Sequence, residues 1–122
     1  MSESVVKIKS FELAIAGVNF YKYLVLEKKE FIMSKQFLRS ITSVGANVRE
    51  AINAQSKFDF IHKLAIAQKE CDETLYWLEL LKETKFIEDQ DFDAIYLKAS
   101  EVLKIIKSII MTTKQNLPVK NS

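Results

Sequence analysis

The chain has 122 residues, of which 48% are hydrophobic and 28% are charged, and its formal net charge is +2. This composition excludes a disordered tail, and the length predicts one domain, residues 1–122, with a single hydrophobic core. The net charge is too small to argue for nucleic-acid binding by itself. One cysteine excludes an intrachain disulfide, no secretion leader is evident, and the apolar runs are too short to span a bilayer, so we expect a cytoplasmic protein.

Two glycines and one proline supply too little turn chemistry for an all-β fold, so helix is expected throughout. Apolar residues that recur every three or four positions predict four helices, at about residues 5–27, 30–54, 57–84 and 89–117. Pro118 is expected to end the last of them. Four helices of similar length with short connections predict an all-α, antiparallel, up-down-up-down four-helix bundle with left-handed crossings.

The same spacing predicts which side of each helix is buried. In the first helix the centre of the buried face is Phe11, Ala14, Val18, Tyr21 and Val25, widened by Leu13, Gly17, Phe20 and Leu24. In the second it is Phe31, Leu38, Ile41, Gly45, Val48 and Ile52. In the third it is Ile61, Leu64, Cys71, Leu75 and Leu78, after an N-cap at Ser56. In the fourth it is Phe92, Ile95, Ala99, Val102, Ile106, Ile109 and Thr113.

Charge is unevenly distributed along the chain. Residues 70–93 contain nine acids against two lysines, whereas residues 98–122 contain five lysines against Glu101. Acids at the start of a helix and lysines at its end complement the helix dipole, which explains much of this asymmetry. The other interpretation is a dedicated binding surface.

Three glutamates, Glu50, Glu70 and Glu73, form the only titratable cluster, and no nucleophile accompanies them. No Gly-rich phosphate loop or Cys/His cluster occurs, and no histidine follows a glutamate by three residues as in di-iron bundles. We therefore expect no enzymatic activity, no metal and no cofactor. Cys71 is predicted to be a small core residue, and His62 to lie at the surface or an interface.

A polar face is predicted on the second and third helices, because Ser43, Asn47 and Glu50 share one helix side and Glu70 and Glu73 share another. Buried carboxylates need partners. The expected partners are Arg49, Lys69, Asn47 and Ser43. Two interpretations stay open: a structural hydrogen-bond network that fixes register, or a face shared with a ligand or another subunit.

Bulky apolar residues gather at the end of the third helix, where Tyr76 and Trp77 precede Phe86 and Ile87. Further aromatics lie outside the tightest apolar stripes: Tyr23, Phe37, Phe58 and Tyr96. A bundle of this size cannot bury all of them, so an exposed apolar patch and self-association are expected.

Several segments resemble a bacterial four-helix bundle family whose founding members are encoded in intervening sequences of 23S ribosomal RNA genes. They are 36–51, 59–61, 64–67, 69–74 and 76–78, and the resemblance extends over nearly the whole chain. Its centre is the pattern Ser-x-x-x-Asn-x-x-Glu at residues 43–50. The chain departs from the family pattern at Gly45, often a proline, and at Ala51, often a glycine.

The resemblance implies an antiparallel bundle that assembles as a ring of five subunits, without an established catalytic activity. The signature positions fall on Ser43, Asn47, Glu50, Glu70 and Glu73, and no enzymatic role comes with them. Accessory proteins of diversity-generating retroelements are similar in fold and bind nucleic acid and a reverse transcriptase. Those proteins are strongly basic, whereas this chain is nearly balanced.

We therefore predict a non-enzymatic, ring-forming homo-oligomer, a pentamer by resemblance, that acts as an accessory factor for RNA, DNA or ribonucleoproteins. The expected nucleic-acid contacts are Lys35, Arg39, Arg49, Lys104, Lys107 and Lys114. In a ring, each small basic patch is repeated, so weak contacts add. The alternative is a protein-interaction scaffold that binds a partner helix through an exposed aromatic patch.

Overall fold

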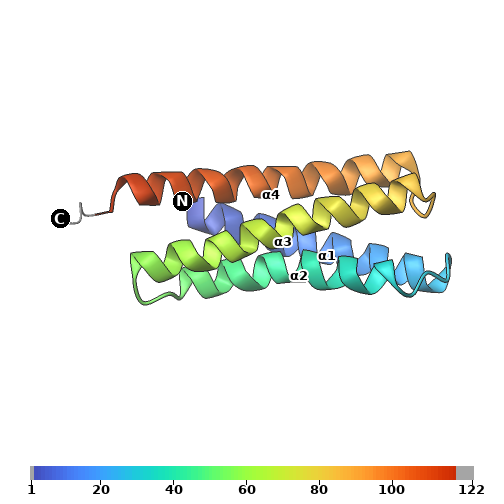
Figure 1. Cartoon of the computed structure of the whole chain (residues 1–122), viewed down its shortest axis with the longest axis horizontal. Coiled ribbons are helices and arrows are strands. Elements are labelled where there is room, and N and C mark those ends of the chain that lie inside the picture. Colours follow the sequence, from blue (N-terminus) through green and yellow to red (C-terminus); the bar gives the residue numbers. More distant parts are fainter. Residues whose placement is uncertain (1, 118–122) are drawn as a thin grey trace.

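Four helices make up the fold in the computed structural model, which describes residues 2–117, with side chains from residue 5 onward (Figure 1). They are α1 (Ser2–Leu26), α2 (Met33–Ile52), α3 (Lys57–Glu83) and α4 (Asp89–Gln115). No strand occurs between residues 2 and 117, so the all-α class and the four helices are confirmed. The predicted stop at Pro118 lies outside the described residues.

Each helix packs against two others. α2 contacts α1 and α3, and α4 contacts α3 and α1, so α2 and α4 lie across the bundle from one another. Figure 1 shows the connection between α2 and α3 at the same end of the bundle as the end of α4. The connections from α1 to α2 and from α3 to α4 lie at the opposite end.

The core on α3 and α4 follows the predicted stripes. Leu64, Cys71 and Leu78 are buried, as are six of the seven predicted positions of α4, from Phe92 to Ile109. Cys71 is confirmed as a core residue, since its Sγ lies 3.3 Å from the Ala99 carbonyl oxygen and burial raises its pKa to about 12. The predicted N-cap is also confirmed, because Ser56 Oγ accepts the backbone N–H of Asp59 at 3.0 Å.

The predicted centre of the buried face of α1 was wrong. Phe11 is 52% exposed. The buried line consists of residues that were expected only to widen the face, preceded by Val6: Leu13, Gly17, Phe20 and Leu24. Apolar residues occur on nearly every side of α1, so periodicity alone does not identify the side that packs. Gly17 fixes it, because a Cβ there would clash with the side chain of Ile41.

The start of α2 also differs from the prediction. The helix begins at Met33 rather than near residue 30, and Phe31 is exposed in the connection instead of buried. Glu30 causes this boundary, because its carboxylate accepts the backbone N–H groups of Ile32, Met33 and Ser34 at 3.2, 3.1 and 2.6 Å. A buried glutamate therefore satisfies donors that a helix start leaves unpaired.

Phe37 was predicted outside the tightest stripes and is instead fully buried. Its ring meets that of Phe20 edge to face, with the centroids 5.7 Å apart. Local spacing on α2 did not reveal this position, because the burial of Phe37 depends on an aromatic partner from α1.

Candidate functional site

The predicted polar face lies along the seam between α2 and α3. Arg39 Nη2 is 3.0 Å from Glu73 Oε2, and Arg39 Nη1 is 3.9 Å from Glu70 Oε2. Lys63 Nζ is 2.9 Å from Glu50 Oε1, and this pairing raises the pKa of Lys63. The predicted partners of these carboxylates, Arg49, Lys69, Asn47 and Ser43, were therefore wrong. Register between helices decides which charges face each other, and α3 brings Glu73 to Arg39 and Lys63 to Glu50.

Ser43 and Asn47 use their polar groups within their own helix. Ser43 Oγ donates to the Arg39 carbonyl at 2.6 Å, and Asn47 Nδ2 donates to the Ser43 carbonyl at 2.8 Å. A buried contact that sequence reasoning missed joins the two helices nearby, where Thr74 Oγ1 lies 3.1 Å from Ser40 Oγ. Two small hydroxyl residues inside an otherwise apolar face were the available signal for this contact.

Two buried polar atoms on this side of α3 have no hydrogen-bond partner among the described residues: Glu70 Oε1 and Trp77 Nε1. One accepts and the other donates, and they belong to residues two turns apart. No three His, Cys, Asp or Glu side chains within the described part of the chain are arranged to hold a metal ion. The geometry supports ion pairing between α2 and α3, and it assigns no catalytic step.

The six predicted nucleic-acid contacts do not form one surface, because three lie on α2 and three on α4, across the bundle. Arg39 is held between two glutamates, and the guanidinium of Arg49 lies 5.2 Å from the centre of the Phe11 ring. Lys35 is exposed on the first turn of α2. Only the lysines of α4 remain as a group.

Lys104, Lys107 and Lys114 are exposed on the second half of α4, and we call them the α4 basic face. The described structure contains no ion pair that involves any of them. Glu101 is the one acid in residues 94–117, and its Oε2 is 3.3 Å from Lys9 Nζ. The positive charge of this face is therefore not balanced by its own helix.

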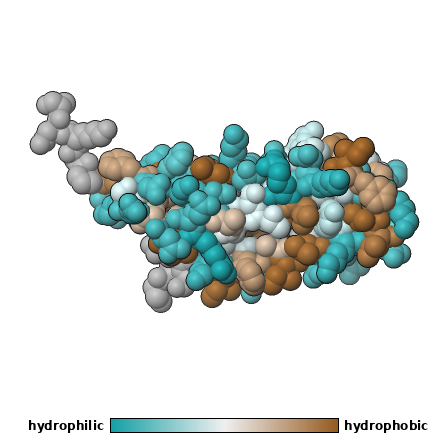
Figure 2. Space-filling view, turned by 90° about the horizontal axis from the view of Figure 1, so that it is seen from below, coloured by the Kyte–Doolittle hydropathy of each residue, from teal (hydrophilic) through white to brown (hydrophobic). Residues whose placement is uncertain are grey.

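Exposed apolar side chains gather on α1, and we call Val5, Ile8, Phe11 and Ile15 the α1 apolar face. A second exposed group, the connection patch, consists of Leu26, Phe31 and Ile32 where α1 leads into α2. Figure 2 shows hydrophobic side chains along one long edge of the molecule and at the end opposite the terminus of α4.

The aromatic end predicted on α3 is smaller than expected. Tyr76 is 56% exposed, but Ile87 is buried and Trp77 and Phe86 are half-buried.

No helix among the described residues is both long and apolar enough to cross a membrane.

The family model described as 23S rRNA-intervening sequence protein matches residues 2–108. A crystal structure of a protein of unknown function from the S23 ribosomal protein family of Bacteroides thetaiotaomicron is similar, with 55% identity and a TM-score of 0.90. The match covers 91% of this chain and 99% of that chain. No curated protein matches the sequence.

Proposed function

This chain belongs to the 23S rRNA intervening sequence protein family, and we propose that it is a non-enzymatic, ring-forming accessory factor for RNA or ribonucleoproteins. The observation that carries the proposal is the α4 basic face, three exposed lysines that no carboxylate of the described chain neutralises. Lysines without protein partners are available to phosphates, and phosphate contacts supply most of the affinity of sequence-independent binding.

The rise of an α-helix places Lys104 and Lys114 about 15 Å apart along its axis. Three lysines along that length contact the backbone of one strand and make a weak site alone. Each phosphate contact with a single strand contributes a slope of about −0.7 to the dependence of log affinity on log salt, so one face predicts a slope near −2. Several copies in one particle add their contacts and increase the slope.

Self-association is part of the same proposal, and we propose that a second copy of this chain covers the exposed apolar surfaces. The α1 apolar face and the connection patch are different surfaces at different places on the molecule. When one patch of a subunit meets the other patch of the next, the contact is head-to-tail, and such contacts close into rings when the rotation permits. Five subunits are the number that the family resemblance implies.

The same proposal includes the up-down-up-down course and left-handed crossings of the helices. The pair Arg39–Glu73 joins α2 and α3, and the pair Tyr96–Glu79 joins α3 and α4 through a 2.9 Å hydrogen bond. Both pairs support neighbouring helices of opposite direction, because the two partners of each pair lie at similar distances from the turn that connects their helices. Crossings near 20° are the usual geometry of such bundles.

The rival function, a scaffold that binds a partner helix, has less support. Of its expected aromatic patch, Tyr76 and Phe58 are widely exposed, but they lie more than four turns apart on α3, and Phe37 and Ile87 belong to the core. Apolar binding of that kind is not screened by salt, so salt dependence separates the two functions.

A titration tests the RNA function. The fluorescence anisotropy of a labelled structured RNA is measured with the wild type and with a variant in which Lys104, Lys107 and Lys114 become glutamate, at low and physiological salt. The control reverses the same number of exposed lysines elsewhere: Lys22, Lys29 and Lys85. We expect salt-sensitive binding by the wild type and the control, and a loss of more than tenfold in the α4 variant. Equal losses in both variants, or no wild-type binding at tens of micromolar, contradict the function.

A further inference from the structure

A groove runs between the first half of α1 and the second half of α2, and we call it the α1–α2 groove. Two adjoining hollows of about 230 and 420 Å³ form it, and both are lined by Lys7, Phe11 and Arg49. The two helices come close together in its floor, since a Cβ at Gly45 would lie 3.2 Å from the carbonyl oxygen of Ser10. The groove borders the α1 apolar face, because Phe11 belongs to both.

The rim of the groove is positive. Lys7 and Arg49 are exposed, and neither takes part in an ion pair within residues 5–117. Glu12 is the one acid among the described residues that line the groove. The guanidinium of Arg49 lies 5.2 Å from the centre of the Phe11 ring, which orients it and leaves its N–H groups available to a carboxylate. The groove therefore fits an aromatic side chain with carboxylates beside it.

A side chain with these neighbours lies on the outward side of α3. Four exposed residues there recur every three or four positions and so share one side of the helix, and we call them the Tyr76 ridge: Asp72, Tyr76, Glu79 and Glu83. Within the described part of the chain, Asp72 and Glu83 form no ion pair and the Tyr76 hydroxyl forms no hydrogen bond. Lys69 is the one exposed lysine between residues 58 and 83, so negative charge is in excess along the ridge.

The positions of the groove and the ridge suit a contact between successive copies. α1 and α3 do not pack against each other, so their outward sides lie on opposite sides of the bundle. Tyr76 is two turns before the end of α3, at the end of the bundle that also carries the connection patch (Figure 1). A copy whose connection patch approaches the α1 apolar face of the next copy therefore brings its Tyr76 ridge toward the groove that borders this face. A contact between two different surfaces of this kind is head-to-tail.

We propose that the α1–α2 groove receives Tyr76 of another copy of this chain, with Lys7 and Arg49 paired to the carboxylates of Asp72 and Glu83. This inference rests on the proposed self-association and deepens it, because it names the polar contacts that decide which surface meets which. Tyrosine and arginine are enriched among the residues that anchor protein interfaces. Opposite charges around an apolar centre fix the register of the contact and disfavour wrong partners.

Charge reversal tests the contact, and light scattering measures the molar mass over a micromolar concentration series. The groove variant carries Lys7→Glu and Arg49→Glu, and the ridge variant carries Asp72→Lys and Glu83→Lys. Glu79 is left unchanged because its Oε2 accepts the hydroxyl of Tyr96 at 2.9 Å.

The control variant reverses two exposed acids at the same end of the bundle but on α4, with Asp91→Lys and Asp93→Lys. We expect the groove and ridge variants to need at least about tenfold higher concentrations than the wild type to associate, as expected when close opposite charges at an interface become like charges. The control should associate like the wild type.

Two combinations should restore association. A chain with all four groove and ridge substitutions presents the same pairs with their signs exchanged. An equimolar mixture of the groove variant and the ridge variant places unlike charges at every contact. The mixture is a second measurement that stands even when the fourfold variant does not fold, and circular dichroism checks the helical content of each chain.

Truncation tests the aromatic centre of the contact. Tyr76→Ala should raise the concentration needed for association by about tenfold or more. Phe58→Ala is the matched control, because Phe58 is 58% exposed and Tyr76 56% exposed on the same helix. It should leave association unchanged.

The other outcomes separate the inference from the self-association on which it rests. A ridge variant that associates like the wild type overturns the inference and leaves self-association through α1 standing. A control variant that is weakened as much as the ridge variant, or equal losses in the two alanine variants, overturns the assignment to Tyr76. Failure of the mixture to associate overturns the pairing of groove and ridge. A wild type with the mass of one chain overturns self-association together with the inference.

Discussion

The helices α1 and α4 are of similar length and differ in what they expose. α4 buries one regular stripe, and its outward side carries the lysines of the α4 basic face. α1 buries a stripe through Leu13 and Phe20 and also exposes Ile8, Phe11 and Ile15 on its outward side. The outward side of α4 exposes Leu97 and Met111 singly among charged residues, whereas α1 gathers its exposed apolar side chains into one stripe, the α1 apolar face. The outward side of α1 is therefore the surface of this chain that most needs a partner.

The largest contrast comes from the same substitution on the two helices. Ile106→Ala removes a fully buried side chain from α4 and should lower the free energy of unfolding by about 2–5 kcal/mol. Ile8→Ala changes a side chain that is 58% exposed and should cost the single subunit about 0.5 kcal/mol. Urea denaturation at low protein concentration measures both. Similar losses would show that the outward side of α1 contributes to the core.

An intermediate effect is expected where α1 meets α2. Gly17→Ala places a Cβ in the space that Cγ2 of Ile41 occupies, and Cδ1 of the same side chain would be only 2.8 Å away. Overpacking of this kind costs about 1–3 kcal/mol, which exceeds the helix propensity of about 1 kcal/mol that alanine gains over glycine. The midpoint of thermal unfolding shows whether the cost of overpacking or the gain in helix propensity is larger. A more stable variant would mean that α1 turns a different side to α2.

The smallest effect lies in the turns that flank these helices. Lys29 follows α1 with φ 56°, and Lys85 precedes α4 with φ 68°, a left-handed conformation that glycine adopts without strain. Lys29→Gly and Lys85→Gly should each raise the free energy of unfolding by about 0.5–1 kcal/mol. Chemical denaturation of each variant beside Lys22→Gly, a helix-interior control that should lose stability, checks the sign.

Much of the fold could be predicted from local pattern. The stripe of α4, the cap at Ser56 and the burial of Cys71 depend on residues within one helix or one turn, and all were predicted correctly. The family was also predicted correctly, because its signature is a local pattern in α2 and α3.

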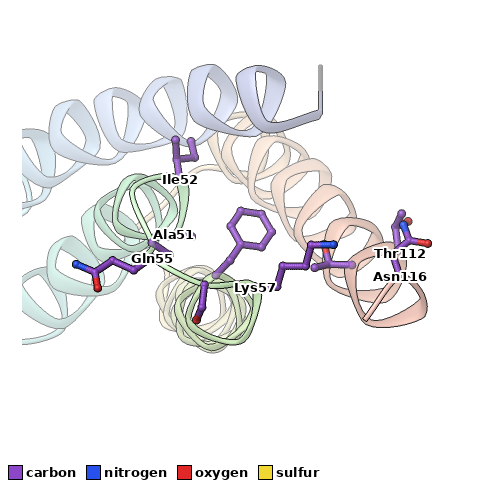
Figure 3. Close-up of a pocket in the computed structure, with 10 residues that line it drawn as sticks. Ala51, Ile52, Gln55, Lys57, Thr112 and Asn116 are labelled. Atoms are coloured by element: carbon purple, nitrogen blue, oxygen red, sulfur yellow. The ribbon is translucent and has the colours of Figure 1, made fainter. Parts of the chain in front are cut away.

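The remaining features depend on contacts between helices. Arg39 as the partner of Glu73, and Phe37 as the partner of Phe20, follow from register and packing that no single segment encodes. Glu30 was expected only at the start of the second helix, and its role as a cap follows from the path of the connection. A cavity lies at the end of the bundle where α2 leads into α3 (Figure 3). Its lining includes Lys57 and Thr112, which are about 55 positions apart, so no sequence spacing indicated it.

The central claim is that another copy of the chain covers the α1 apolar face, and light scattering coupled to size exclusion tests it most directly. We expect the wild type at micromolar concentration to have a molar mass of several chains, each of 14.1 kDa. A variant with Ile8→Lys and Ile15→Lys should have the mass of one chain and retain its helical content. A wild-type mass of 14.1 kDa would contradict the claim, because it would leave the apolar side of α1 uncovered in solution.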